Sequence, residues 1–250
     1  MVSESQSEMM TGRSGPFLRE KGEKLEQFET VRVRFRKVGH LQYISHLDLQ
    51  RSMMRILVRA GIPVWYTQGF NPHAKIVFAL PLPIGVQSVC ELMDIRLDRQ
   101  ITCDEVKDRL NKALTDEMQV TSVYKSDIKF TDIGYAVYAY SFDRLGQNRP
   151  KPEEVVSLLK KPDLFVQKHT KAGEKEVCLA DVLDEISSDY EGNKLNLKVR
   201  LSCGTNRETV SPVQVTEAIT KAFALYENEA DERIENMRVE IQDMQGKPFV

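Results

Sequence analysis

The stretch that says most about the fold is SHLDLQRSMMRILVRAGIPVWYTQGFNPHAKIVFALPLPIGVQS, residues 45–88. It opens with Ser45 and Asp48, the spacing of a helix N-cap, in which a serine hydroxyl accepts a backbone hydrogen bond at the helix start. Gly61, followed by Pro63, is a typical helix stop. These signals predict a helix over about residues 46–60. Its core-facing side is expected to hold Leu47, Met54, Leu57 and Val58, extended by Met53 and Ile56.

Strands are predicted on both sides of this helix. Before it, residues 30–38 (TVRVRFRKV) alternate apolar and arginine side chains, which is typical of a strand with one buried and one basic face. After it, the segments 62–67, 75–80 and 91–97 have the composition of strands. Residues 68–73 (QGFNPH) are expected to form a loop, because Gly69 permits a positive φ and Asn-Pro favours a turn.

The order of elements predicts the fold class. A helix over 104–114 and a strand over 118–124 complete the order β-α-β-β-α-β, with one extra or split strand, which is that of the ferredoxin-like unit. The second half repeats this order, with alternating strands at 134–142, 194–202 and 237–244, helices from 152 and 211, a hairpin at 164–179 and a helical turn at 182–187. We therefore predict an α+β fold with two tandem ferredoxin-like halves and open-faced antiparallel sheets. The predicted limits are 1–28 for a disordered tail, 29–127 for the first half and 128–250 for the second.

Composition limits the class of protein. The 250 residues are 41% hydrophobic and 29% charged, as in ordinary globular domains. No apolar run approaches the roughly 20 residues of a membrane helix, and the first residues do not resemble a secretory signal. The four cysteines are far apart, which argues against a zinc ribbon or a self-contained iron–sulfur site. We expect a cytoplasmic protein with no membrane contact, no metal and no cofactor.

The charge is unevenly distributed along the chain. The formal net charge is −2, but residues 29–78 contain eight basic and two acidic residues. The remainder of the chain must therefore be acidic. Such an asymmetry favours an anionic ligand on one face of the protein; the alternative is a set of solvated side chains.

Basic and aromatic residues in this segment suggest RNA binding. Arginines repeat every four residues along the predicted helix, and three more lie on the outer face of the first strand. Aromatic rings close by are candidates for stacking on unpaired bases. The candidate residues are Arg32, Arg34, Arg36, Arg51, Arg55, Arg59, Trp65, Gln68, Phe70, Asn71 and Lys75. For Trp65 and Phe70, the alternative is a place in the core.

Acid–base catalysis is a second possibility. His46 lies in the first turn of the predicted helix, where the helix dipole favours the neutral imidazole. Asp48 and His73 would lie near it if the 68–73 loop folded over the helix start, and a neutral histidine beside a carboxylate can act as a general base. The alternative is that Asp48 completes the cap and His46 only packs.

The same stretch resembles a known bacterial family. The matching residues are Ser45-His46-Leu47-Asp48-Leu49 with Arg51, then 59–64 (RAGIPV), 68–73 (QGFNPH), and 80–86 (LPLPIGV) with Ser88 and Glu91. Together they are similar to the radical-SAM-associated domain of unknown function, which occurs alone or fused to cobalamin-binding radical SAM proteins. Ala74 departs from the family pattern, which usually has proline there.

The resemblance implies a role beside a radical SAM enzyme. The chain has no C-x-x-x-C-x-x-C cluster of its own, so it resembles the accessory half of such a pair. We expect an accessory RNA-binding protein that presents tRNA or rRNA to a radical SAM modification enzyme. Two alternatives are an RNA-processing or RNA-modifying enzyme with His46 as general base, and a protein-interaction adaptor for a radical SAM partner without nucleic acid.

Overall fold

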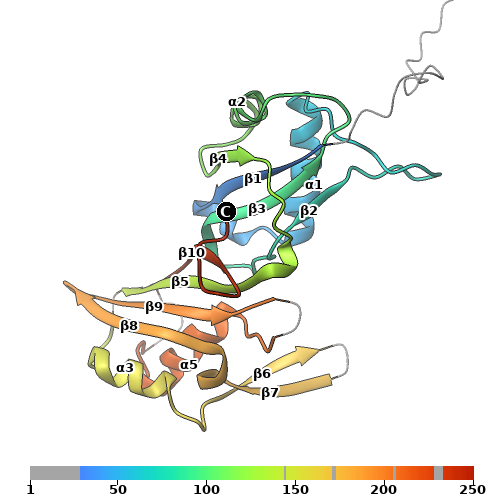
Figure 1. Cartoon of the computed structure of the whole chain (residues 1–250). Helices are drawn as coiled ribbons and strands as arrows, with labels where there is room; N and C mark the ends of the chain where they lie inside the picture. Colours follow the sequence, from blue (N-terminus) through green and yellow to red (C-terminus); the bar gives the residue numbers. More distant parts are fainter. Residues whose placement is uncertain (1–28, 144, 171–172, 205–206, 228–232) are drawn as a thin grey trace, which may run out of the picture.

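The computed structural model describes residues 29–143, 145–170, 173–204, 207–227 and 233–250 (Figure 1). The predicted tail, 1–28, lies outside the described residues. The strands are β1 (Thr30–Lys37), β2 (Ile76–Phe78), β3 (Gln87–Arg96), β4 (Met118–Tyr124), β5 (Ile133–Asp143), β6 (Phe165–Thr170), β7 (Gly173–Cys178), β8 (Leu183–Glu191), β9 (Lys194–Ser202) and β10 (Arg233–Asp243). The helices are α1 (His46–Arg59), α2 (Cys103–Ala113), α3 (Pro152–Leu159), α4 (Leu179–Val182) and α5 (Pro212–Phe223), with short 3-10 helices η1 (Gly39–Tyr43) and η2 (Phe130–Asp132).

One eight-stranded sheet runs through both halves. Its strand order is β4-β1-β3-β10-β5-β9-β8, and β2 pairs with β3 beside this path. All of these pairings are antiparallel except that of β10 with β3, where Met237 lies opposite Gln87 and Arg238 opposite Ser88. We call this two-pair junction the seam. The hairpin β6-β7 forms a separate two-stranded sheet.

The α+β class is confirmed, but the predicted halves share a sheet. We expected a sheet in each half, whereas the seam makes their strands continuous. Each half orders its strands in the same way, β4-β1-β3-β2 in the first and β10-β5-β9-β8 in the second. The ferredoxin-like description and the boundary at residue 128 stay predictions.

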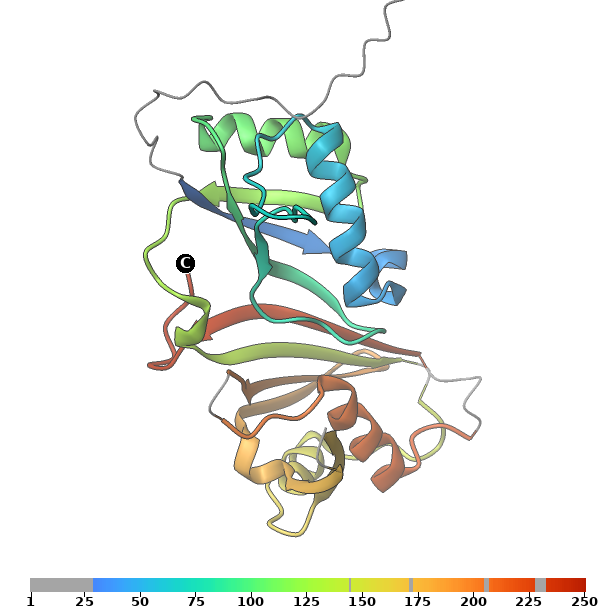
Figure 2. The same ribbon diagram turned by 90° about the vertical axis from the view of Figure 1, so that its right-hand side faces the viewer.

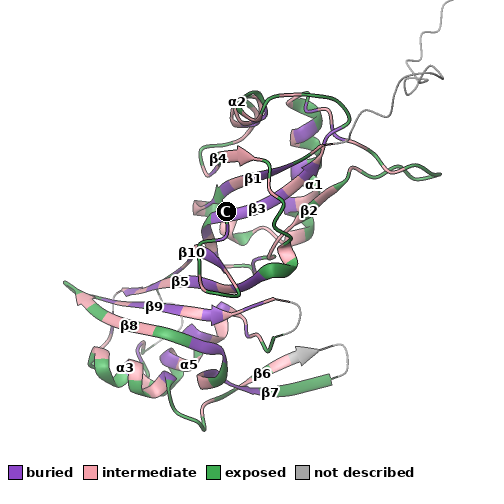
Figure 3. Cartoon of the chain, in the orientation of Figure 1, coloured by how far each residue is buried: buried purple, intermediate pink, exposed green. Residues whose placement is uncertain are grey.

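Each half has its own hydrophobic core on one face of the sheet. In the first half, Leu49, Met53 and Leu57 of α1 pack against the buried face of β1, together with apolar residues of α2. In the second half, α3 and α5 cover β5 and β9. Figure 3 shows buried segments along the central strands β1, β3, β10, β5 and β9 of the large sheet. The helices of each half therefore pack on the strands of that half.

The predicted core-facing side of α1 is wrong in part. Leu47, Met54 and Val58 are 60%, 38% and 66% exposed, while Leu49, Met53 and Leu57 are at most 5% exposed. Apolar residues surround most of this helix, so their spacing is compatible with more than one inward direction. The outcome leaves an exposed apolar stripe on α1, in the same sector as Arg51.

Two predicted elements differ from the structure. Residues 62–67 form isolated bridges, Val64 with Leu97 and Tyr66 with Ala74, instead of a continuous strand. The predicted helical turn at 182–187 is instead the start of β8, which pairs with β9 through an irregularity between Asp184 and Ser187. β8 lies at the edge of the sheet with one side in solvent, so its sequence is largely polar. This polar composition is why the strand was not predicted.

Candidate nucleic-acid-binding surface

The start of α1 is held by its own side chains. The Ser45 hydroxyl accepts a hydrogen bond from the Asp48 backbone N–H (3.1 Å) and donates to the Asp48 carboxylate (2.7 Å). The carboxylate also lies 3.4 Å from the Arg51 guanidinium. An exposed pair at this distance contributes little to stability. Arg51 and Arg55 are both exposed, so they can meet an external anion.

Arg59 has a different role from the other two arginines of α1. Its guanidinium donates to the backbone carbonyl of Ala113, the last residue of α2. The last carbonyls of a helix have no partner within the helix, and a cation there also interacts favourably with the helix dipole. Arg59 therefore fastens α1 to the end of α2.

The three arginines of β1 lie on the opposite face of the sheet from α1. Side chains alternate along a strand, and Val31, Val33 and Phe35 are fully buried in the core beneath α1 and α2. The intervening arginines therefore project the other way. The basic residues of β1 and those of α1 therefore lie on opposite sides of the sheet and do not form one continuous surface.

Arg32 is buried in contacts of its own. It is 2% exposed and hydrogen-bonds both carboxylate oxygens of Asp94 (2.8 and 3.0 Å). Its guanidinium also lies over the rings of Phe130 (4.2 Å) and Phe249 (5.2 Å). The face of the sheet that was expected to be open is thus covered here, and the Arg32 guanidinium is not accessible to an RNA phosphate.

Arg34 and Arg36 are more accessible than Arg32. Arg34 is half-buried and lines a cavity of about 340 Å³ with Cys90 and Phe249. Arg36 is exposed and donates a hydrogen bond to the Asp116 carbonyl (2.8 Å). Neither extends the surface formed by α1.

The loop predicted at 68–73 is the tip of a hairpin that projects from the first half (Figure 1). Its arms are joined by backbone hydrogen bonds from Thr67 to His73 and from Lys75 to Trp65, both 2.9 Å. Gly69 has φ 140°, a conformation that side chains other than glycine rarely adopt. Phe70, at the tip, has a relative exposure of 107%, so its ring faces solvent on all sides.

The rest of the hairpin is also largely exposed. Gln68, Asn71 and Lys75 are exposed, whereas Trp65 is half-buried. The Arg96 guanidinium lies 4.5 Å from the centre of the Trp65 ring, a cation–π geometry. Phe70 is therefore the ring presented for stacking, while Trp65 supports the base of the hairpin. Figure 2 looks from the side to which the hairpin projects, and α1 faces the viewer beside it.

The three proposed catalytic residues, His46, Asp48 and His73, do not form a hydrogen-bonded group in the described part of the structure. His46 packs edge-on against Phe78, with ring centres 5.5 Å apart. Burial lowers the pKa of His46, and the nearby Glu91 charge opposes this effect. Asp48 is engaged in the helix cap, and the His73 backbone N–H is bound to the Thr67 hydroxyl. Within the described ranges, no hydrogen bond or ion pair connects these three side chains.

A buried charged cluster at the seam, formed by Lys37, Glu91 and Arg238, was not predicted from the sequence. Arg238 is 1% exposed, forms an ion pair with Glu91 and donates to the Leu80 carbonyl (2.7 Å). Lys37, 2% exposed, donates to the carbonyls of Leu41 and Val86, both 3.1 Å away. Burial lowers the pKa of Lys37, and the charge of Glu91 opposes this shift. The sequence signal was weak: one acid beside apolar residues in a strand.

The described residues contain no group of three or more His, Cys, Asp or Glu side chains placed to hold a metal ion. No helix among them has the length and apolar character needed to cross a membrane.

Comparisons with known proteins place the chain in a family without defining its activity. No curated protein matches it. Among solved structures, a Cbf5-Nop10-Gar1 complex matches with a TM-score of 0.43 and 10% identity over 84% of this chain, which spans about half (48%) of the matched chain. An unknown protein from Galdieria sulphuraria matches with a TM-score of 0.25 and 14% identity over 85% of this chain and 99% of its own. The model of the family described as "Uncharacterized protein conserved in bacteria (DUF2344)" matches residues 30–212, so the chain belongs to that family.

Proposed function

We propose that the protein is an RNA-binding accessory factor, which presents tRNA or rRNA to a radical SAM modification enzyme. The supporting observation is the face formed by α1 and the projecting hairpin. It combines the exposed side chains of Arg51, Arg55 and Lys75 with the fully exposed ring of Phe70. Between residues 39 and 78 the sequence contains one acid, Asp48.

This combination suits unpaired RNA better than a uniform basic patch does. Arg51 and Arg55 are one helical turn apart, about 6 Å along the axis, so they can contact separate phosphates. An aromatic ring that stacks on a base contributes about 1–3 kcal/mol and tolerates any base. Arginines thus supply a salt-sensitive attraction and Phe70 a salt-insensitive one.

The radical SAM partner rests on the resemblance of residues 45–91 to the radical-SAM-associated family. A cytoplasmic location is part of the same proposal. It is supported by the four cysteines, which are all free thiols, as is typical of a reducing compartment.

A salt titration tests the RNA proposal. Binding of the full chain to total tRNA is measured by fluorescence anisotropy at several salt concentrations. The double variant Arg51→Gln/Arg55→Gln is expected to reduce the slope of log K against log salt by about 1.5, because each lost phosphate contact removes roughly 0.7–0.9. The matched control is Arg34→Gln/Arg36→Gln, on the other face of the sheet, which should leave the slope unchanged.

Phe70→Ala separates stacking from charge in the same assay. It is expected to weaken binding by about 5-fold or more without a change in the salt slope. Absence of tRNA binding at low salt, or equal effects of the two double arginine variants, would refute the assignment of RNA to this face.

A protein-interaction adaptor is the second candidate, favoured by the exposed apolar stripe on α1. Leu47 and Val58 lie on it, and Tyr43 and Ile84, also more than half exposed, come from segments that meet at the Gly85–Gln42 backbone hydrogen bond. Exposed apolar patches of this kind often mark protein interfaces. Co-purification with a radical SAM protein after nuclease treatment, lost in Leu47→Ser/Val58→Ser but kept in Arg51→Gln/Arg55→Gln, would favour the adaptor.

A further inference from the structure

A cavity of about 520 Å³ lies where the two halves meet, away from the α1 face. Its volume is within the range of sites that hold small organic molecules. One wall is residues 79–83 of the first half. Another part of the wall is formed by residues 201–204, where β9 ends, and by residues 209–212, which lead into α5.

The walls of this cavity are mostly apolar and stiff. Three prolines, Pro81, Pro83 and Pro212, line it together with Leu80, Leu82, Phe130, Ile133, Leu201 and Val210. Three hydroxyl side chains, those of Ser202, Thr209 and Ser211, are also part of the lining. The Ser211 hydroxyl accepts a hydrogen bond from the Val213 backbone N–H, and the Thr209 hydroxyl accepts one from Lys168. The cavity therefore presents a mainly apolar surface with a small number of polar groups.

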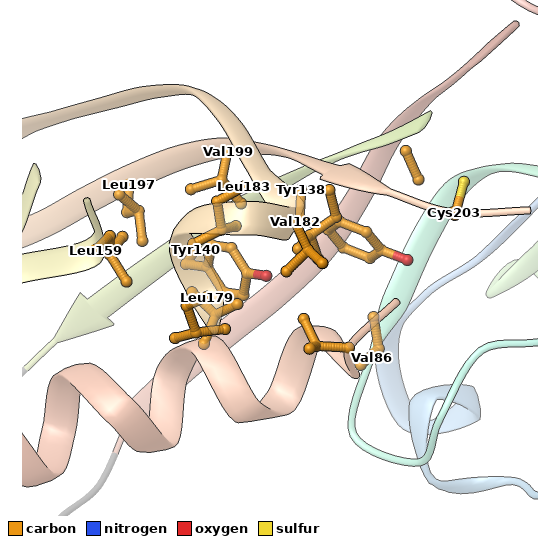
Figure 4. Close-up of a cluster of buried hydrophobic side chains, with 14 of the residues drawn as sticks. Val86, Tyr138, Tyr140, Leu159, Leu179, Val182, Leu183, Leu197, Val199 and Cys203 are labelled. Carbon is orange, nitrogen blue, oxygen red and sulfur yellow. The ribbon is translucent and has the colours of Figure 1, made fainter. Parts of the chain in front are cut away.

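Tyr138 is the polar group best placed to orient a ligand. Its ring belongs to the core of the second half, and its hydroxyl points toward the side where Cys203 and Val86 lie (Figure 4). Tyr138 and Cys203 both line the cavity. Burial raises the pKa of Tyr138 to about 12 and that of Cys203 to about 11. Both groups are therefore protonated at neutral pH, and the tyrosine can donate a hydrogen bond.

A buried positive charge lies behind this wall. Arg238 binds the carbonyl of Leu80, which lines the cavity, and its charge opposes the pKa shifts of both Tyr138 and Cys203. The guanidinium also makes a side-chain hydrogen bond with Tyr138, which places its positive charge beside the tyrosine hydroxyl. Its Nε and Nη1 atoms are buried and have no close hydrogen-bond acceptor among the described residues, although buried donors normally have one. Arg238 and Lys37 together carry two positive charges, whereas Glu91 carries one negative charge. The net positive charge favours an anion at this end of the cavity.

We propose that the cavity binds a small organic acid with an apolar or aromatic body. The body fills the space between the prolines of residues 81–83 and Val210. The carboxylate accepts a hydrogen bond from the Tyr138 hydroxyl and faces the charge of Arg238. This site is independent of the RNA-binding face, because it shares no residue with α1 or the hairpin.

Calorimetric titration of the full chain with 2-naphthoate, and with its uncharged isostere 2-naphthamide, tests the proposal. We expect the carboxylate to bind at least about tenfold more tightly than the amide. Tyr138→Phe removes the donor without changing the ring, so it should weaken naphthoate binding about tenfold, because hydrogen bonds to charged groups are strong. The control Tyr43→Phe, at an exposed tyrosine, should have no effect.

A second pair of variants tests the position of the site. Val210→Trp fills the cavity and should abolish binding, whereas Val58→Trp makes the same change on the exposed face of α1 and should leave it intact. Thermal unfolding establishes that each variant is folded. Failure of naphthoate to bind at millimolar concentration, equal affinity for the amide, or unchanged binding by Tyr138→Phe overturns the proposal.

Discussion

Replacing Glu91 by glutamine tests the charged cluster at the seam. Glu91 and Arg238 are 4% and 1% exposed and form an ion pair. Glutamine keeps the shape of the side chain but leaves the guanidinium without a compensating charge. Removing one partner of a buried pair typically costs about 3–5 kcal/mol, and Lys37 loses a favourable neighbour in the same change. Total stabilities are about 5–15 kcal/mol, so this is a large fraction.

Urea unfolding, followed by circular dichroism, measures the effect. With a slope of about 2–3 kcal/mol/M for a chain of this size, the midpoint should fall by about 1–2.5 M. Glu235→Gln, an exposed residue of the same strand as Arg238, is the control and should change stability by no more than about 0.5 kcal/mol.

A double variant separates two effects: losing the ion pair itself, and leaving Arg238 buried without a compensating charge. Glu91→Leu/Arg238→Met replaces both charges with apolar groups, and such replacements are often neutral or stabilising. We expect it to recover most of the stability that Glu91→Gln loses. If Glu91→Gln behaves like Glu235→Gln, or if the double variant is as unstable as the single one, the cluster does not hold the seam together by charge pairing.

Three further predictions concern the first half. Met53→Ala should lower the free energy of unfolding by about 2–5 kcal/mol, whereas Leu47→Ser should change it by less than about 0.5 kcal/mol, both measured by urea unfolding. Arg59→Ala should cost about 1 kcal/mol by removing the contact with the end of α2, and tRNA affinity should fall far less than in Arg51→Gln/Arg55→Gln. For His46, an NMR titration should give a pKa below its ordinary value of 6.5, because burial disfavours the imidazolium. The unfolded state then binds more protons below pH 6.5, so stability should decrease as the pH falls through the folded-state pKa, and His46→Gln should reduce that slope.

Strong local signals predicted the secondary structure well. The helix cap at Ser45 has its expected geometry, and Thr102 caps α2 in the same way. The alternating segments at 118–124 and 194–202 coincide with β4 and β9. Each of these signals depends on neighbouring residues, so the sequence alone contains the necessary information.

Long-range contacts could not be predicted in this way. The seam consists of two residue pairs between strands about 150 positions apart, and no periodicity reveals it. The burial of Arg32 likewise depends on Asp94, Phe130 and Phe249, which are distant in the chain. The opposite placement of the β1 arginines and α1, however, does follow from strand alternation, once the apolar face of β1 is assumed to lie against the helix.

The stretch 45–88 therefore has two distinct tasks. Its final part, residues 80–88, supplies the carbonyls of Leu80 and Val86 that bind Arg238 and Lys37, and thus serves the junction between the halves. Its earlier part exposes Arg51, Arg55 and Phe70. These three side chains contribute less to the folded structure than the two carbonyls do. Substitutions at the buried residues of the final part, such as Val86 and Ser88, should accordingly impair folding and binding together, while those at the three exposed residues should impair binding alone. The density of unusual residues in one sequence segment thus reflects both a structural junction and the adjoining surface that we assign to RNA.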